Sequence, residues 1–159
     1  EAAAETVLVA RRAFDGTILA EQELKLESAP RSTTKAMLKR SIAQPEDPAD
    51  ELISAGAPAA TFWFFDFDRN LRYPQAEFDA SIERRGDEHR LTIRAKTLLR
   101  DLILNADRAD PAAVVSEQLV TLLPGESFTF VVRSQKELTV DELTRHPVLQ
   151  CANRFGASG

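Results

Sequence analysis

The chain has 159 residues, of which 43% are hydrophobic and 28% are charged, and its formal net charge is −5. These values are typical of a folded globular protein, and the length suits one ordinary domain or two small ones. The acidic balance without a basic stripe argues against nucleic-acid binding, and no apolar run approaches the ~18 residues that a membrane span needs.

The chain contains one cysteine, Cys151, which excludes an internal disulfide framework and favours a reducing compartment. We therefore expect a cytoplasmic protein with no nucleic-acid and no membrane partner. The opening residues, Glu-Ala-Ala-Ala, are neither an initiator methionine nor a signal peptide, so we interpret the chain as a piece of a longer polypeptide.

The first half favours strands separated by turns. Residues 6–12 (TVLVARR) are rich in β-branched side chains and predict a strand. Asp15-Gly16 predicts a turn, and the alternating residues 18–26 predict a second strand. Residues 33–42 suit a strand or a short helix, and we favour a strand.

A short helix is predicted over residues 48–55. Asp47 can cap it, Pro48 suits its first position and Gly56 can end it. The aromatic residues 61–67 (TFWFFDF) then predict another strand.

The second half has a clearer strand pattern. The expected strands are residues 77–83, 91–96, 99–104 and 114–123. The Arg-Gly-Asp sequence at residues 85–87 predicts the hairpin turn between the first two.

The sequence LPGE at residues 123–126 predicts a type II turn, because proline pre-sets the first central residue and glycine tolerates a positive φ at the second. In the strand that follows, Phe128, Phe130 and Val132 alternate onto one apolar face.

The end of the chain predicts one more helix and a last strand. Thr139 and Glu142 have the spacing of a capping box, which opens a short helix that stops before Pro147. Residues 148–152 then predict the final strand.

Roughly nine or ten short strands with little helix are typical of β-sandwiches. We therefore predict an all-β, immunoglobulin-like β-sandwich fold, with two short helices, built as two small sandwiches or as one large one. The polar stretch 69–74 ends in proline and is the expected junction. Two sandwiches would then comprise a partial one over residues 1–68 and a C-terminal one over residues 69–159.

Acidic residues are the first candidates for chemistry, since a glycoside hydrolase needs two carboxylates about 5–9 Å apart. Asp66 and Asp68 lie near Trp63 and Tyr73 in the sequence, but the acids of this chain are typical of turn caps and solvated loops. We assign no catalytic residue.

Asp66, Asp68, Asn70 and Glu77 match positions 1, 3, 5 and 12 of a calcium-binding loop. Leu71 stands where that loop requires glycine, so an acidic loop between strands is favoured. We expect no metal and no cofactor.

The aromatic run at residues 62–65 (FWFF) has two interpretations. Exposed aromatic side chains could stack on sugars, with Trp63 and Tyr73 as the candidate carbohydrate contacts. Burial on both faces is favoured, because an exposed phenylalanine-rich strand promotes aggregation.

His89 follows a hairpin turn and His146 precedes a proline, and neither has a serine, a cysteine or a second histidine beside it, so surface roles are favoured. Cys151 lies in an apolar stretch and is more typical of a small core residue than of a nucleophile.

Residues 64–83 (FFDFDRNLRYPQAEFDASIE), 91–130 and 147–153 (PVLQCAN) follow one another in an order that resembles the C-terminal end of bacterial β-mannosidases of glycoside hydrolase family 2. Residues 7–30 are similar to the later strands of the domain that precedes this end. Residues 116–118 (Ser-Glu-Gln) depart from the Ser-Asp-Asn that often stands there in the family.

The resemblance implies immunoglobulin-like domains that follow a catalytic (β/α)8 barrel. The acid/base of that barrel follows an asparagine in an Asn-Glu pair, which this chain lacks, so no catalytic residue is transferred. The implied parent is a retaining exo-glycosidase that removes terminal β-linked mannose. This chain would be an accessory region that packs against the barrel or a partner subunit. The alternative is an autonomous carbohydrate- or protein-binding module on the same scaffold.

Overall fold

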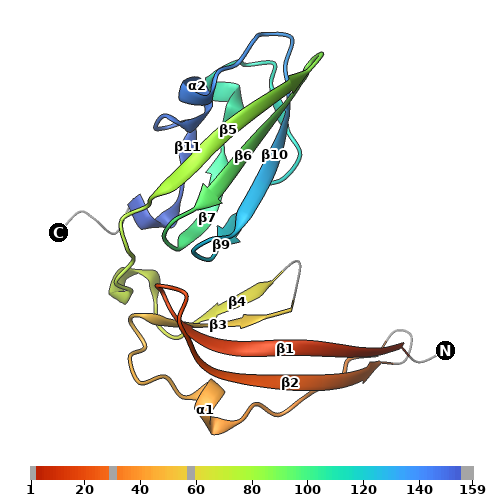
Figure 1. Ribbon diagram of the computed structural model, residues 1–159, viewed down its shortest axis with the longest axis vertical. Helices are drawn as coiled ribbons and strands as arrows, with labels where there is room; N and C mark the ends of the chain where they lie inside the picture. Colours follow the sequence, from red (N-terminus) through yellow and green to blue (C-terminus); the bar gives the residue numbers. More distant parts are fainter. Residues whose placement is uncertain (1–2, 29–31, 57–59, 155–159) are drawn as a thin grey trace. The chain divides into compact units, whose positions relative to one another are not determined.

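The computed structural model describes residues 3–28, 32–56 and 60–154, and it divides the chain into two compact units (Figure 1). Unit 1 is Glu1–Arg72 and unit 2 is Tyr73–Gly159. Antiparallel strands dominate both units, so the predicted all-β fold is confirmed. No helix in the described ranges is long and apolar enough to cross a membrane.

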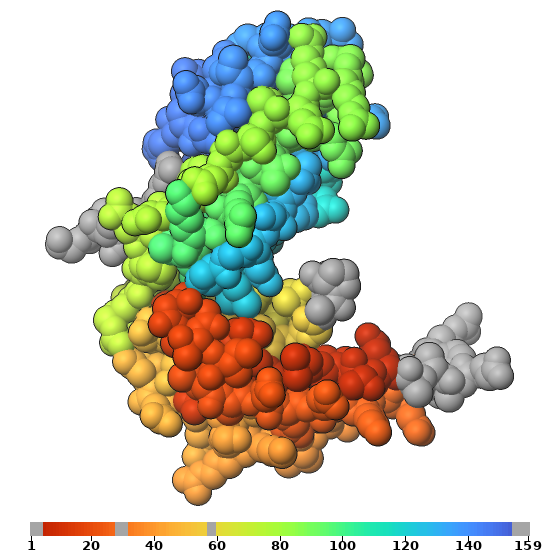
Figure 2. All heavy atoms as spheres, in the orientation of Figure 1, coloured from red at the N-terminus to blue at the C-terminus, as the bar shows by residue number. Residues whose placement is uncertain are grey.

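Unit 1 contains one four-stranded antiparallel sheet in the order β2-β1-β3-β4. Its strands are β1 (Ala3–Ala13), β2 (Ile18–Ser28), β3 (Glu51–Ala55) and β4 (Thr61–Phe64). β1 and β2 form a long hairpin, whose red and orange atoms make up a continuous part of the visible surface in Figure 2. The three strands predicted at β1, β2 and β4 are confirmed, with different ends.

The turn of this hairpin is set by local chemistry, as its sequence predicts. Asp15 Oδ1 accepts a hydrogen bond from the Thr17 amide at 2.8 Å, and Gly16 adopts a φ of +93°. Glycine adopts a positive φ without the steric cost that a side chain brings. The hairpin register shifts between Arg11 and Arg12, which marks a β-bulge.

The helix predicted over residues 48–55 is wrong, because most of these residues form strand β3. Asp47 does accept a hydrogen bond from the Ala49 amide at 3.2 Å, but only a turn follows it. β3 pairs with β1 on one side and β4 on the other, and its Leu52 is fully buried. This tertiary packing outweighs the local signal for a helix.

The strand predicted over residues 33–42 is also wrong. Residues 32–39 run without a turn or bend but pair with no strand in the described part of the chain. Helix α1 (Arg40–Ala43) follows, and its Ile42 is fully buried in a small core that includes Val9 of β1. The segment therefore covers the sheet by packing onto it instead of joining it.

A buried ion pair ties this part of the chain to the sheet. Arg11 of β1 and Glu51 of β3 lie 2.5 Å apart, nitrogen to oxygen, and each side chain is only 6% exposed. Arg11 Nε also donates to the Ser41 carbonyl at 2.8 Å. The second oxygen of Glu51 accepts hydrogen bonds from the amides of Glu46 and Asp47 at 3.2 and 2.9 Å. The pair thereby fixes the loop between α1 and β3.

Unit 2 is a sandwich of two antiparallel sheets. The sheet β5-β6-β10-β8 consists of Phe78–Arg85, Glu88–Ala95, Ser127–Arg133 and Val114–Val115. The sheet β11-β7-β9 consists of Leu149–Gln150, Leu99–Leu104 and Val120–Leu122. Leu91 and Phe130 from the first sheet and Leu149 from the second share one buried apolar core.

The connections contain short local structures. Three 3-10 helices lie in the described ranges, at Asp68–Asn70, Ala106–Arg108 and Ala152–Arg154. The predicted hairpin turn between β5 and β6 is confirmed, since Arg85 pairs with Glu88 across it.

The predicted LPGE turn and the apolar face after it are confirmed. The Glu126 amide donates to the Leu123 carbonyl at 3.0 Å, and Gly125 has a φ of +88°. In β10, Phe130 and Val132 are fully buried and the face they share points into the core of unit 2.

The single strand predicted over residues 114–123 is wrong, because the chain breaks into β8 and β9, which belong to different sheets. Leu119 lies between them with a φ of +62°. The side-chain amide of Gln118 accepts a hydrogen bond from the Leu104 amide at 3.0 Å and donates to the Leu104 carbonyl at 2.8 Å. The Gln118 side chain thus forms, with Leu104 at the end of β7, the two hydrogen bonds that a neighbouring strand would otherwise form.

Helix α2 (Val140–Thr144) begins at the predicted capping box. The Thr139 side chain accepts from the Glu142 amide at 3.2 Å, and the Glu142 carboxylate accepts from the Thr139 amide at 3.0 Å. Lys136 Nζ donates to the same carboxylate at 2.9 Å. These donors, the Lys136 ammonium first, lower the pKa of Glu142 to about 2.

We predict that Arg11→Ala greatly lowers the urea concentration at which unit 1 unfolds. Removing the cation leaves Glu51 buried and unpaired, which costs on the order of 3–5 kcal/mol. Trp63 is the only tryptophan of the chain and belongs to unit 1, so its fluorescence reports this transition. The control is Arg72→Ala, which removes an exposed ion pair with Asp47 and costs at most ~1 kcal/mol. Equal shifts for the two variants would contradict the role of the buried pair.

A second prediction concerns the free energy of unfolding at acid pH. Because the folded-state pKa of Glu142 is lowered, its stabilising contribution is present above the ordinary value of 4.5 and is lost as the pH falls through about 2. Glu142→Gln should therefore flatten the acid-induced loss of unfolding free energy across this range, measured by urea unfolding followed by circular dichroism. Glu117→Gln changes an exposed carboxylate outside the cap and should keep the wild-type slope. The same slope in both variants would exclude the cap as the source.

Candidate functional site

Asp66, one of the acids considered for chemistry, holds a turn, and so does Asp110. Asp66 accepts hydrogen bonds from Asn70 Nδ2 at 2.9 Å and from the Phe67 amide at 2.7 Å. These bonds, the Asn70 bond first, lower the pKa of Asp66. Asp110 accepts from Ser134 Oγ at 2.5 Å, and this bond is the main cause of its lowered pKa. The prediction that these acids cap turns is confirmed.

The surroundings of Asp50 raise its pKa, in contrast to those of Asp66 and Asp110. Partial burial raises its pKa, Arg72 lowers it, and nearby Asp47, Asp15 and Glu51 raise it further. A general acid for glycoside hydrolysis has a raised pKa, but it also needs a second carboxylate across a sugar-binding site. Here burial and the crowding of acids in the turn before β3 account for the shift.

The residues with calcium-loop spacing serve local structure. Asp66 binds the side chain of Asn70, and Asp68–Asn70 form a 3-10 helix. Across the described ranges, no group of three or more His, Cys, Asp or Glu side chains could hold a metal ion.

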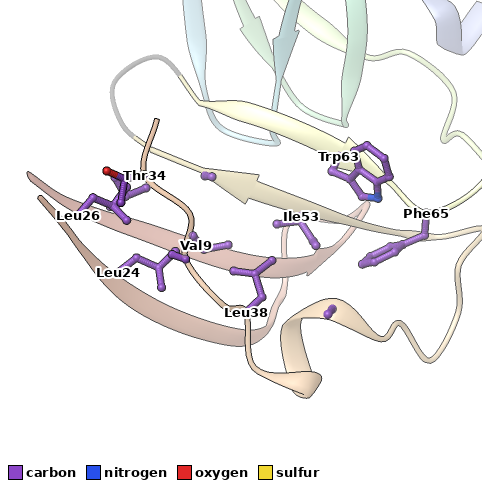
Figure 3. Close-up of a pocket in the computed structure, with 12 residues that line it drawn as sticks. Val9, Leu24, Leu26, Thr34, Leu38, Ile53, Trp63 and Phe65 are labelled. Carbon is purple, nitrogen blue, oxygen red and sulfur yellow. The ribbon is translucent and has the colours of Figure 1, made fainter. Parts of the chain in front are cut away.

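An apolar groove of about 600 Å³ lies on one face of the unit 1 sheet (Figure 3). Strand alternation builds its floor, because side chains two residues apart share a face of a sheet. The floor residues are Val7 and Val9 of β1, Leu24 and Leu26 of β2, and Ile53 and Ala55 of β3. All six are aliphatic, so the floor offers an occupant burial but no side-chain hydrogen bonds.

The rest of the lining comes from three other segments, one of which is helix α1, which contributes Ala43. Thr34, Ala36 and Leu38, every second residue of segment 32–39, line one side. Trp63 of β4 and the following Phe65 lie at one end of the groove, and Thr34 lies at the other (Figure 3). The Thr34 hydroxyl and the Trp63 indole N–H are the hydrogen-bonding side-chain groups in the lining, which suits an apolar occupant better than a sugar.

The groove is the feature that sequence analysis missed. Its signal was present in the first hairpin, where Val7 lies opposite Leu24, and Leu24 and Leu26 alternate with charged residues. Such alternation also predicts an ordinary core face. Only the structure shows that no second sheet covers that face within the described part of unit 1.

Trp63, the first predicted carbohydrate contact, lies at this groove and is 66% exposed. Phe67 is 73% exposed. The favoured prediction, burial of the aromatic strand on both faces, is therefore wrong for these two residues. The physical reason is that β4 is a short edge strand, and within the described residues no second sheet covers its Trp63 side. On its other face, Phe64 packs edge to face against Phe14, with ring centroids 5.9 Å apart.

Tyr73, the second predicted contact, belongs to unit 2 and is partly buried. Its hydroxyl accepts a hydrogen bond from the Arg100 guanidinium, whose central carbon lies 5.6 Å from the ring centroid. Because Trp63 belongs to unit 1, neither unit by itself contains both predicted contacts.

The surface role predicted for His89 is wrong. His89 is fully buried on the inward face of β6, and its Nε2 accepts a hydrogen bond from the Leu138 amide at 3.3 Å. Its Nδ1 has no hydrogen-bond partner in the described residues. His146 is exposed and Cys151 is buried in the core of unit 2, both as predicted.

The fold of this chain is similar to that of part of a solved enzyme structure. The chain is similar to part of the crystal structure of β-D-mannosidase from Dictyoglomus thermophilum, with a TM-score of 0.65 and 17% sequence identity. The match covers 95% of this chain but only 18% of that one. The exo-chitosanase CsxA from Amycolatopsis orientalis matches with a TM-score of 0.46 and 9% identity, over 96% of this chain and 23% of that one. No family model and no curated protein matches the sequence. The chain thus shares the fold of a region of the first enzyme.

We predict that Trp63→Ala changes the thermal stability of unit 1 very little, because the side chain is largely in solvent. Ile53 lies opposite Trp63 in the β3–β4 ladder and is only 9% exposed. Ile53→Ala should lower the free energy of unfolding by about 2–5 kcal/mol. Thermal unfolding followed by circular dichroism compares the two. A loss in Trp63→Ala as large as that in Ile53→Ala would show that the tryptophan is structural and not free for a partner.

Proposed function

We propose that this chain is a non-catalytic, immunoglobulin-like C-terminal region of a β-mannosidase-like glycoside hydrolase of family 2. Its catalytic barrel would lie elsewhere in the parent protein, which hydrolyses terminal β-D-mannose residues from β-mannosides. The chain would pack against that barrel and stabilise it. A single buried cysteine accords with a parent that works in the reducing cytoplasm.

The observation that carries this proposal is the shared fold. The similarity to the β-D-mannosidase spans 95% of this chain while taking up 18% of that enzyme, as expected of an accessory region. The order of segments 64–83, 91–130 and 147–153 supports the same family. Side-chain chemistry agrees with a non-catalytic role, because Asp66 and Asp110 cap turns and the groove lining contains no carboxylate.

The test compares this chain with its parent. The purified chain should leave p-nitrophenyl β-D-mannoside intact, whereas the parent protein should hydrolyse it with retention of configuration. Turnover by the chain alone would overturn the non-catalytic role. A parent that leaves the substrate intact would overturn the assignment to β-mannosidases.

A second candidate is an autonomous carbohydrate-binding module, and the exposed Trp63 at the groove favours it. Titration with mannobiose and mannan, followed by the fluorescence of this single tryptophan, separates the two. A saturable shift would support the binding module. We expect no shift, because a sugar needs several polar groups and the groove lining provides the Thr34 hydroxyl and the Trp63 indole N–H.

A further inference from the structure

The groove face of the unit 1 sheet is only partly covered. A sheet with one apolar face is stable when another layer packs on it. In unit 1 that layer consists of segment 32–39 and α1, and Trp63 remains 66% exposed beside them. Six of the eight exposed large hydrophobic residues in the described ranges lie in unit 1. They are Leu8, Ile18, Leu19, Met37, Trp63 and Phe67, and of these six Trp63 lines the groove.

Segment 32–39 has the side-chain alternation of a β-strand. Thr34, Ala36 and Leu38 line the groove, whereas Lys35 and Met37 between them do not; of the three lining residues Leu38 is partly buried, and Met37 is 88% exposed. This period of two is the strand period. Residues 33–38 thus have the pattern of a strand, and they pair with no strand in the described ranges.

Hydrogen bonds between side chains and backbone groups hold the segment against β2. Gln22 Nε2 donates to the Met37 carbonyl at 3.1 Å, and Thr34 Oγ1 donates to the Glu27 carbonyl at 2.8 Å. Within the described part of the chain, no backbone–backbone hydrogen bond involves residues 33–38. Apart from the Met37 carbonyl, the backbone amides and carbonyls of residues 33–38 are therefore available to a neighbouring strand, as at the edge of any sheet.

We propose that segment 32–39 and the groove together form a docking surface for a β-strand from another region of the parent glycoside hydrolase. That strand would form ladder hydrogen bonds with residues 33–38 and place every second side chain in the groove. This proposal rests on the proposed function, because it takes the partner strand from the parent enzyme.

Charge specifies the alternate residues of that strand. Lys35 and Lys39 are exposed on the side of the segment that faces away from the groove. Neither lysine forms an ion pair in the described residues. Opposite charges on facing positions stabilise a strand pair, and like charges destabilise it. The partner strand therefore alternates apolar side chains, which enter the groove, with carboxylates, which face the lysines.

The test uses the complete chain and two synthetic peptides. One peptide alternates valine with glutamate and the other alternates valine with lysine. We expect the glutamate peptide to shift Trp63 fluorescence saturably and the lysine peptide to bind roughly tenfold more weakly at low salt, with a smaller difference at high salt. Equal affinity of the two peptides at low salt, or no shift with either, would overturn the proposal.

Variants assign the binding to this surface. Lys35→Glu combined with Lys39→Glu changes two exposed side chains and should reverse the preference between the peptides. Val7→Glu places a carboxylate in the groove and should abolish binding. Leu8→Glu is its matched control, because Leu8 is the next residue of β1, points to the other face and is 46% exposed. Peptide binding that survives Val7→Glu, or an unchanged preference in the double variant, would contradict the proposed site.

Two other occupants would also overturn the proposal. A concentration-dependent dimer that buries Trp63, seen by light scattering and fluorescence, would assign the groove to a second copy of this chain. A shift with mannobiose but with neither peptide would assign it to a sugar. Failure of the proposed function has a separate readout, which is a parent protein that does not hydrolyse the mannoside.

Discussion

The arrangement of unit 1 depends on one buried ion pair, between Arg11 of β1 and Glu51 of β3, at 2.5 Å. Buried charges are tolerated only when their partners satisfy them. Here the remaining bonds go to backbone groups between residues 41 and 47. These hydrogen bonds hold the loop against the strands and keep Ile42 buried on the sheet, beside the groove. The shape of the groove therefore depends on charge pairing as well as on apolar packing.

The two units satisfy the need to bury a sheet in different ways. Unit 2 places two sheets around one core, to which Leu91, Phe130 and Leu149 contribute. Unit 1 has one sheet in the described residues, and an irregular segment lies on part of its groove face. A sheet face that remains partly open is suited to packing against more protein. Within the proposed accessory role, unit 1 would therefore provide the contact to the rest of the parent, and unit 2 would be a self-contained sandwich.

Features encoded by neighbouring residues could be predicted from the sequence. The LPGE turn and the capping box at Thr139 depend on contacts within a few residues, and both were predicted correctly. The failures involve distant partners. A helix was expected where Glu51 instead pairs with Arg11, 40 residues away, and the burial of His89 depends on packing that its hairpin position does not reveal. For the candidate site, the sequence indicated Trp63 but not the groove beside it, because alternation cannot tell a covered sheet face from an open one.

Hydrogen exchange at the amides of residues 33–38 can detect the proposed strand pairing. If the partner strand belongs to the parent enzyme, these amides exchange fast in the isolated chain and are strongly protected in the intact parent, where ladder hydrogen bonds would form. Equally fast exchange in both proteins would contradict this pairing.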